Sequence, residues 1–214
     1  MGIFPDPKLD YEEGLVGVGG TLEVPVLLEA YSKGIFPWPQ EGYPMLWFCP
    51  EKRGILKFDQ FRIPSSLKKK LKIYRHIRYT KNQKFAEVIR ACADQKRLNQ
   101  LGTWISEPII KAYIKFHKAG YAHSWEVWEG DELVGGGYGV LCQGVFSGES
   151  LFHKKTNMSK LALIQMIEDL KAQGLNWMDT QMVTPLLKTF GAEEITKKQY
   201  LKLLLATQDK SLIK

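Results

Sequence analysis

Cysteine is scarce in this chain of 214 residues, which contains only Cys49, Cys92 and Cys142. The number is odd and no two of them form a C-x-x-C pair, so the sequence argues against a disulfide framework and against a zinc site. We therefore expect each cysteine to be a small buried apolar residue, and the chain to work without a metal in a reducing compartment, the cytoplasm.

Long apolar runs are also missing. No stretch of about 18 apolar residues exists, which excludes a membrane-spanning helix. The first fourteen residues carry neither the cationic flank nor the apolar centre of a secretory signal. With 44% hydrophobic and 12% aromatic residues, the composition is instead that of a globular protein with a sizeable core.

Acidic residues are absent from one basic segment. Residues 60–86 carry nine Lys and Arg and no Asp or Glu, while the whole chain has a net charge of +7. The nine cations exceed that surplus, so the rest of the chain is net acidic and the positive charge is local. Such a patch favours a polyanion, nucleic acid first, although a solvated lysine-rich face is the simpler alternative.

Hydrophobic spacing and cap residues predict an order of elements along the chain. We expect helices over residues 23–33, 82–95, 106–119, 160–173, 184–191 and 197–206. Alternation predicts an edge strand over 73–79 and three consecutive strands over 123–128, 133–140 and 145–152, which form an antiparallel meander. Residues 34–50 hold two Trp, two Phe and four Pro, and we expect their backbone to be irregular.

The stretch 135–181 organises the rest, because it ends in a buried strand over residues 175–181 that carries polar groups. A period of two places Asp179 and Gln181 on one face of this strand, at its C-terminal end. Open α/β sheets usually bind ligands at that edge. The sequence therefore predicts a cleft into which an acid and a carboxamide project together.

Helices, an antiparallel meander, a helix and a further strand are typical of the acetyltransferase-like (GNAT) α+β fold. Users of acyl-CoA in that fold carry a glycine-rich phosphate loop before the helix that follows the meander. Residues 153–159 contain no glycine at this junction. An acyl-CoA donor is therefore disfavoured.

Several rare strings then resemble a known family. They are GIFPW at 34–38, WFCP at 47–50, TWI at 103–105, HSWEVW at 123–128, ELVGG at 132–136, GESLF at 148–152 and DTQ at 179–181. In this order they resemble the leucyl/phenylalanyl-tRNA–protein transferase family over nearly the whole chain, from Gly14 to about Leu204.

This resemblance implies a small N-terminal domain, placed at residues 1–58, and a GNAT-like catalytic domain at residues 59–214. It implies an aminoacyltransferase that moves Leu or Phe, with Met as a further donor, from charged tRNA to the α-amine of proteins that begin with Arg or Lys. Such transfer marks the acceptor for degradation. No metal or organic cofactor is expected, and we expect a monomer in the cytoplasm.

The same resemblance, combined with the chemistry of the side chains, gives a set of site residues. As a hypothesis, Asp179 orients or deprotonates the acceptor amine, Gln181 holds the ester or its oxyanion, and Glu149 shares the proton network or meets the cationic acceptor side chain. The predicted substrate-binding residues are Trp38, Trp104, Tyr113, Phe146, Met178 and Ser150. The predicted tRNA-binding residues are Lys68, Lys69, Lys70, Lys72, Arg75 and Arg78.

Two departures from the family pattern bear on the site. Leu186 stands where the family has a His, and Gly137 replaces a bulkier apolar residue, which would enlarge the donor pocket. Three other interpretations stay open at this point: a GNAT-like transferase with a small-molecule or cell-wall acceptor, a related transferase for acidic acceptors, and a tRNA-binding module without chemistry.

Overall fold

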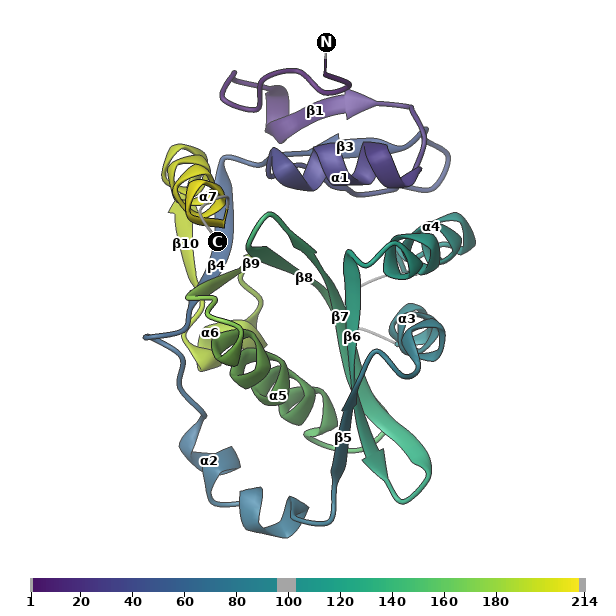
Figure 1. The fold of residues 1–214 in the computed structure, drawn as a ribbon, viewed down its shortest axis with the longest axis vertical. Coiled ribbons are helices and arrows are strands. Elements are labelled where there is room, and N and C mark those ends of the chain that lie inside the picture. Colours follow the sequence, from purple (N-terminus) through teal and green to yellow (C-terminus); the bar gives the residue numbers. More distant parts are fainter. Residues whose placement is uncertain (1, 96–102, 212–214) are drawn as a thin grey trace.

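A computed structural model describes residues 2–95 and 103–211, with the side chains of 209–211 left aside. The chain forms a small three-stranded sheet, at the top of Figure 1, and a large seven-stranded sheet, which lies below it and fills the middle of the view. Helices cover both faces of the large sheet. The molecule is thus a mixed α+β structure in layers.

The small sheet is built by the N-terminal part of the chain. Its strands β1 (Leu15–Val18), β3 (Leu46–Phe48) and β2 (Phe36–Pro37) are antiparallel in that order. A 3₁₀ turn, η1 (Glu12–Gly14), precedes them, and helix α1 (Val24–Ser32) packs beside them with Leu27, Ala30 and Tyr31 buried.

The large sheet has the order β10-β4-β9-β8-β7-β6-β5. All neighbouring pairs are antiparallel except β8 and β9, which are parallel. The strands are β4 (Lys52–Lys57), β5 (Arg78–Lys81), β6 (Ala122–Glu129), β7 (Glu132–Cys142), β8 (Val145–His153), β9 (Trp177–Gln181) and β10 (Glu193–Thr196).

Two hydrophobic clusters lie on the two faces of this sheet. On one face, α1 and the helices α3 (Phe85–Asp94), α4 (Glu107–Lys118) and α7 (Lys197–Ser211) pack against the strands. On the other, α5 (Met158–Ala172) runs along the sheet and α6 (Pro185–Phe190) follows β9 (Figure 1). The remaining segments, α2 (Ser65–Lys68) and the 3₁₀ helix η2 (Leu71–Tyr74), link β4 to β5.

The predicted order of helices and the meander β6-β7-β8 are confirmed, but several local predictions are wrong. The edge strand expected over 73–79 begins only at Arg78, because backbone pairing with β6 starts there and residues 71–74 form η2. The helix expected to start after Ser159 begins at Met158, since Asn157 takes up a left-handed conformation with φ of 70° as its N-cap.

The backbone of residues 34–50 is more regular than predicted. Pro37 is accepted in β2 because that strand is at the sheet edge, where a missing N–H leaves no ladder bond unmade, and β3 itself contains no proline. Strand β4 lies inside the large sheet although its residues fall within the predicted N-terminal domain. The boundary at residue 58 stays a prediction.

A helix that spans a membrane must be both long and apolar. Across residues 2–95 and 103–211, no helix is long enough and apolar enough to cross a bilayer.

Close contact between α5 and β7 gives a first prediction. The Cβ that Gly135→Ala adds would lie 2.5 Å from Met158 Cβ and 2.8 Å from its carbonyl carbon, so the start of α5 must move. We expect a loss of about 1–3 kcal/mol in the free energy of unfolding, measured by urea denaturation.

Gly17→Ala is the matched control, because its nearest neighbour would be Trp47 Cδ1 at 3.7 Å, an ordinary contact. Equal stability losses in the two variants would contradict the packing argument.

Candidate functional site

A cavity opens where β8 and β9 separate. These parallel strands are paired only through Phe146 with Met178 and Ser147 with Asp179. Beyond that point β8 continues to His153 along β7, whereas β9 ends at Gln181 and the chain turns into α6. The cavity lies in the gap between these two strands.

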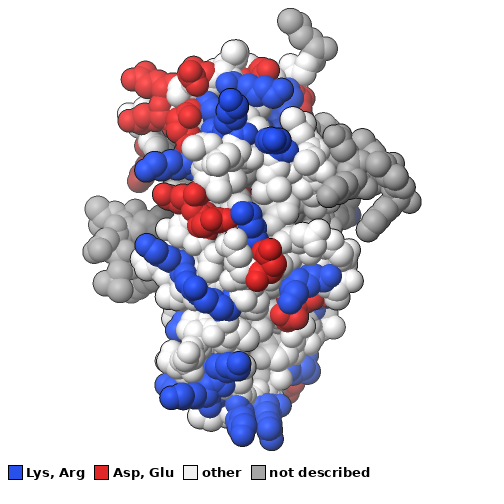
Figure 2. Space-filling view, turned by 90° about the vertical axis from the view of Figure 1, so that its left-hand side faces the viewer, with Lys and Arg blue, Asp and Glu red and all other residues white. Residues whose placement is uncertain are grey.

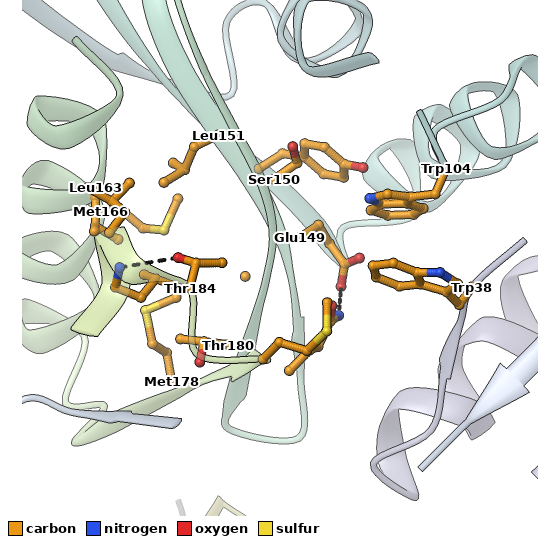
Figure 3. Close-up of a pocket in the computed structure, with 16 residues that line it drawn as sticks. Trp38, Trp104, Glu149, Ser150, Leu151, Leu163, Met166, Met178, Thr180 and Thr184 are labelled. Carbon is orange, nitrogen blue, oxygen red and sulfur yellow. Dashed lines mark hydrogen bonds between the residues drawn. The ribbon is translucent and has the colours of Figure 1, made fainter. Parts of the chain in front are cut away.

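The cavity has a volume of about 290 Å³ and two different ends (Figure 3). Its apolar end lies toward α5 and α6, and its polar end lies toward the small sheet and α4. The lining residues are Trp38, Trp104, Tyr138, Gly148, Glu149, Ser150, Leu151, Leu163, Met166, Met178, Thr180, Gln181, Met182, Thr184, Leu186 and Leu187.

Two tryptophans form the wall at the polar end. Trp38 follows β2 and Trp104 precedes α4, and their rings stack with centroids 5.6 Å apart and an interplanar angle of 16° (Figure 3). They come from segments far apart in the sequence. Their faces offer a flat aromatic surface of the kind on which nucleobases stack.

Glu149 stands in front of this wall and is held by neutral donors. The Tyr31 hydroxyl donates to Glu149 Oε1 at 2.7 Å, and Gln181 Nε2 donates to the same oxygen at 2.9 Å. Tyr31 in turn shares a short hydrogen bond with the hydroxyl of Tyr113. The carboxyl group is only partly exposed, and it is exposed to the cavity.

Desolvation dominates the surroundings of Glu149. Loss of hydration raises its pKa to about 8, the Tyr31 hydrogen bond opposes that shift, and the Asp179 charge adds to it. Near neutral pH Glu149 is therefore largely protonated, and it can lose its proton close to physiological pH, as a group that takes part in acid–base chemistry must.

Asp179 lies behind the cavity in an ion pair. Its Oδ1 accepts Arg53 Nε at 2.9 Å and its Oδ2 accepts Arg53 Nη2 at 2.5 Å. The side chain of Asp179 is fully buried, and that of Arg53 is 1% exposed. Tyr200 and Ser147 donate further hydrogen bonds to Oδ2, at 3.0 and 3.3 Å.

The prediction that Asp179 and Gln181 project together into one cleft is wrong, because Gln181 lines the cavity and Asp179 does not. A bulge at Thr180 breaks the period of two, since Gly54 pairs with Gln181 while Ile55 already pairs with Asp179. Gln181 also has a φ of 59°, in the left-handed region. Both features re-aim the Gln181 side chain.

The other predicted substrate residues divide in the same way. Met178 and Ser150 line the cavity with Trp38 and Trp104, whereas Tyr113 lies behind Tyr31. Phe146 does not line it: its ring packs edge-on against Trp125 in the core beneath α5.

Sequence reasoning missed Arg53, Tyr31 and Tyr200. One signal was available for Arg53, because it directly precedes the apolar stretch Gly54–Leu56, and an arginine inside a buried strand needs an acidic partner.

The two departures from the family pattern both touch the apolar end. Leu186 lines the cavity, so an apolar side chain stands where the family has an imidazole. The space beside Gly137 is occupied by Leu151, whose Cδ2 lies where a side chain at residue 137 would begin. Leu151 itself lines the cavity, so Gly137 acts on its shape through that neighbour.

A basic end of the molecule lies around α2 and η2, remote from the small sheet (Figure 1). Blue side chains gather there in Figure 2, whereas blue and red are mixed at the other end. All its members are exposed, and none forms an ion pair with a described acidic residue. The guanidinium carbon of Arg78 lies 4.9 Å from the centroid of the Trp128 ring. The basic end comprises Lys68, Lys69, Lys70, Lys72, Arg75 and Arg78.

Metal ligands do not converge in the part of the chain that the structure describes. No group of three or more His, Cys, Asp or Glu residues is arranged to hold a metal ion there.

Comparison with known proteins decides the family. The family model for leucyl/phenylalanyl-tRNA protein transferase matches residues 55–205, and the model for the N-terminal domain of the same transferase matches residues 20–51. The chain belongs to this family. It is accordingly an aminoacyltransferase.

Individual relatives agree with the family models. The leucyl/phenylalanyl-tRNA–protein transferase of Pseudoalteromonas translucida is 44% identical over 201 residues, which cover 94% of this chain and 84% of the relative. That of Pseudoalteromonas atlantica is 45% identical over 200 residues, covering 92% and 85%.

A solved structure, that of FemX, is similar with a TM-score of 0.50 at 11% identity, over 83% of this chain and 70% of that one. The GNAT-like fold is confirmed.

The raised pKa of Glu149 gives a second prediction. Between about pH 4.5 and 8 the folded protein retains a proton that the unfolded chain has lost, so stability falls as pH rises through this window. Glu149→Gln keeps an acceptor for Tyr31 and Gln181 without a titrating group. Urea unfolding at pH 5 and pH 8 should show the variant losing less stability, by on the order of 2–4 kcal/mol.

Glu132→Gln, at an exposed carboxylate, is the control and should follow the parent protein. Parallel stability curves for all three proteins would show that Glu149 titrates normally.

Proposed function

We propose that this transferase moves leucine or phenylalanine from its charged tRNA onto the α-amine of proteins that begin with arginine or lysine. The observation that carries this proposal is a single cavity in which an apolar chamber, a stacked tryptophan pair and a desolvated carboxyl group lie side by side. These three parts suit the three chemical groups that must meet: an apolar aminoacyl side chain, a nucleoside and a cationic acceptor.

The apolar chamber supports Leu, Phe or Met as donors. Leu163 and Met166 from α5 and Leu186 and Leu187 from α6 enclose it, and Leu151 forms its floor. Flexible methionine and leucine side chains adapt to linear, branched and aromatic groups alike. The terminal adenosine of the tRNA would then lie toward Trp38 and Trp104, one ribose away from the aminoacyl group.

The chemistry requires little activation. The aminoacyl ester is already reactive, and an α-amine with a pKa near 7.7–8.0 is partly neutral at pH 7. The amine nitrogen forms a bond to the ester carbon, and the bond from that carbon to the ribose oxygen breaks. The amine loses one proton, and the ribose oxygen takes one up. Positioning of the two substrates contributes most to the rate.

Glu149 is suited to the cationic end of the acceptor. A guanidinium or ammonium group that reached its carboxyl oxygen would favour the ionised form and form a strong, water-excluded ion pair. Gln181 Nε2 donates a hydrogen bond to Glu149 Oε1, so the Gln181 amide would lie beside both the acceptor and the ester. Among the described residues Glu149 has no ion-pair partner, and its hydrogen-bond donors are neutral, which supports an external cation.

The surroundings of the reaction complete the proposal. We infer that the basic end receives the tRNA, since its exposed cations have no acidic partners among the described residues and can contact phosphates. We infer a monomeric protein of the cytoplasm, because a single chain supplies all the parts of the cavity and its three cysteines are buried as free thiols. The transfer would mark its acceptors for degradation.

A third prediction tests the acceptor. Labelled Leu, Phe or Met on tRNA is offered with peptides that begin with Arg, Lys, Asp or Glu, and transferred label is measured. Leu and Phe should reach Arg and Lys peptides. Glu149→Gln should lower kcat/KM for these by roughly 10- to 100-fold, mainly through the KM of the peptide, because the buried counter-charge is gone.

Glu132→Gln should again match the parent protein. Transfer to acidic peptides instead would indicate the related acidic-acceptor enzymes, and tRNA retention without transfer would indicate a binding module.

A fourth prediction tests the basic end. Lys68→Ala with Lys70→Ala should weaken tRNA binding and make the slope of log affinity against log salt shallower by roughly 1.5–2, because two phosphate contacts no longer release counterions. Filter binding across a salt series measures both quantities.

Lys84→Ala with Lys171→Ala removes the same charge from two exposed lysines already paired with Glu87 and Glu168, and should change neither. Identical slopes for the two double variants would place the tRNA elsewhere.

A further inference from the structure

The carboxylate of Asp179 has no free position for a substrate. Two carboxylate oxygens offer about four lone-pair sites. Five donors already point at them: Arg53 Nε and the Gln181 backbone N–H at Oδ1, and Arg53 Nη2, the Tyr200 hydroxyl and Ser147 Oγ at Oδ2. The group is also fully buried and outside the cavity lining.

Arg53 is held by this carboxylate and by aromatic rings, while its Nη1 is buried without a hydrogen-bond partner among the described residues. Its guanidinium lies between two aromatic rings, 4.7 Å from the centroid of Phe36 and 4.4 Å from that of Tyr200. Phe36 belongs to the small sheet and Tyr200 to α7. Residues from the N-terminal and the C-terminal parts of the chain thus both contact the Arg53 guanidinium. Asp179 is its ion-pair partner among the described residues.

The clamped carboxylate acts on the cavity through Gln181. Asp179 Oδ1 accepts the Gln181 backbone N–H at 2.8 Å, and this residue has a φ of 59°. A non-glycine residue in that region needs support from its surroundings. The re-aimed side chain then donates to Glu149 at 2.9 Å. A path of direct contacts thus runs from Arg53 to the group that faces the substrates.

We propose that Arg53 is a positioning residue of the transfer reaction: it neutralises and orients the buried Asp179 carboxylate, so that Asp179 can hold the Gln181 backbone in the turn that presents the Gln181 amide to the reacting groups. This inference rests on the proposed function and deepens it. Asp179 then serves as a fixed acceptor for the turn and does not take the proton of the attacking amine, which is balanced by the proton that the leaving ribose oxygen takes up.

Removal of both charges together separates this role from proton transfer. Arg53→Met leaves an unpaired buried carboxylate, and Asp179→Asn leaves an unpaired buried guanidinium. We expect each single variant to lose 100-fold or more in kcat, while the KM for charged tRNA stays within about 3-fold because the basic end is unchanged. In the double variant the carboxamide introduced by Asp179→Asn can still accept the Gln181 N–H with no charge left over, and kcat should return to within about 10-fold of the parent.

A double variant as inactive as Asp179→Asn would overturn the proposal, because it would show that the acid itself is needed. Circular dichroism and thermal unfolding check each variant. Where a single variant does not fold, the double variant decides alone, since it carries no unpaired charge.

Tyr200→Phe removes one donor to Oδ2 and should lower kcat by roughly 3- to 10-fold with an unchanged pH profile. A shifted profile would assign a titrating role to Asp179 and contradict the proposal.

Aminoacyl transfer by the parent protein distinguishes a failure of the proposed function from a failure of the positioning role. If it transfers no aminoacyl group to any peptide, the proposed function fails. If it transfers normally while a folded double variant stays inactive, only the positioning role of the Arg53–Asp179 pair fails.

Discussion

The separation of β8 from β9 is the constraint on which the site depends. Only two residue pairs hold these parallel strands together before β9 turns away. Along the rest of β8, the edge that would face β9 has no partner among the described strands and opens on the cavity, while the opposite edge stays paired with β7. Peptide groups on such an open edge remain available to a ligand. An interior position in the sheet thereby becomes a binding site without any loss of the surrounding core.

Two carboxyl groups lie on either side of this gap, and they have different partners. Glu149 is removed from water and receives only neutral donors, so desolvation dominates and its pKa rises to about 8. Asp179 is buried more deeply, yet it receives a bidentate arginine, and the charge of the pair raises the pKa of Arg53 even though burial alone would lower it. A group that exchanges protons and a group that holds the framework are thus distinguished by their partners rather than by their depth.

Much of the fold could be predicted from the sequence, because its helices and the meander carry clear hydrophobic periods and glycine or proline boundaries. The chemistry of the cavity was accessible where residue types are rare and clustered, as with Trp38, Trp104 and Glu149. What could not be predicted was how β9 ends. A period of two assigns Asp179 and Gln181 to one face, and only the pairing with β4 reveals the bulge that turns one of them away.

The same limit explains why Arg53 was missed. Its partner lies 126 residues further along the chain, and strand β4 has no alternation that would distinguish a charged core position from an exposed one. The fit of the turn over it also depends on Gly54, where an added Cβ would lie 2.6 Å from the carbonyl carbon of Met182 and 2.7 Å from Thr180 Oγ1. Such a contact between distant segments has no local sequence signal except the small Gly54 next to the charged Arg53.

The first 38 residues of the chain therefore contribute directly to the candidate site. Tyr31 in α1 donates to Glu149, Trp38 after β2 forms a wall of the cavity, and Phe36 covers the guanidinium that holds Asp179. Tyr31 links α1 to β8, Phe36 links β2 to β4, and Trp38 stacks on Trp104 beside the cavity. A buried hydrogen bond to an acid contributes about 1–3 kcal/mol, and the aromatic contacts add to it. The two sheets consequently form one unit at the cavity, and a displacement of the small sheet would disturb Glu149, the tryptophan wall and Asp179 together.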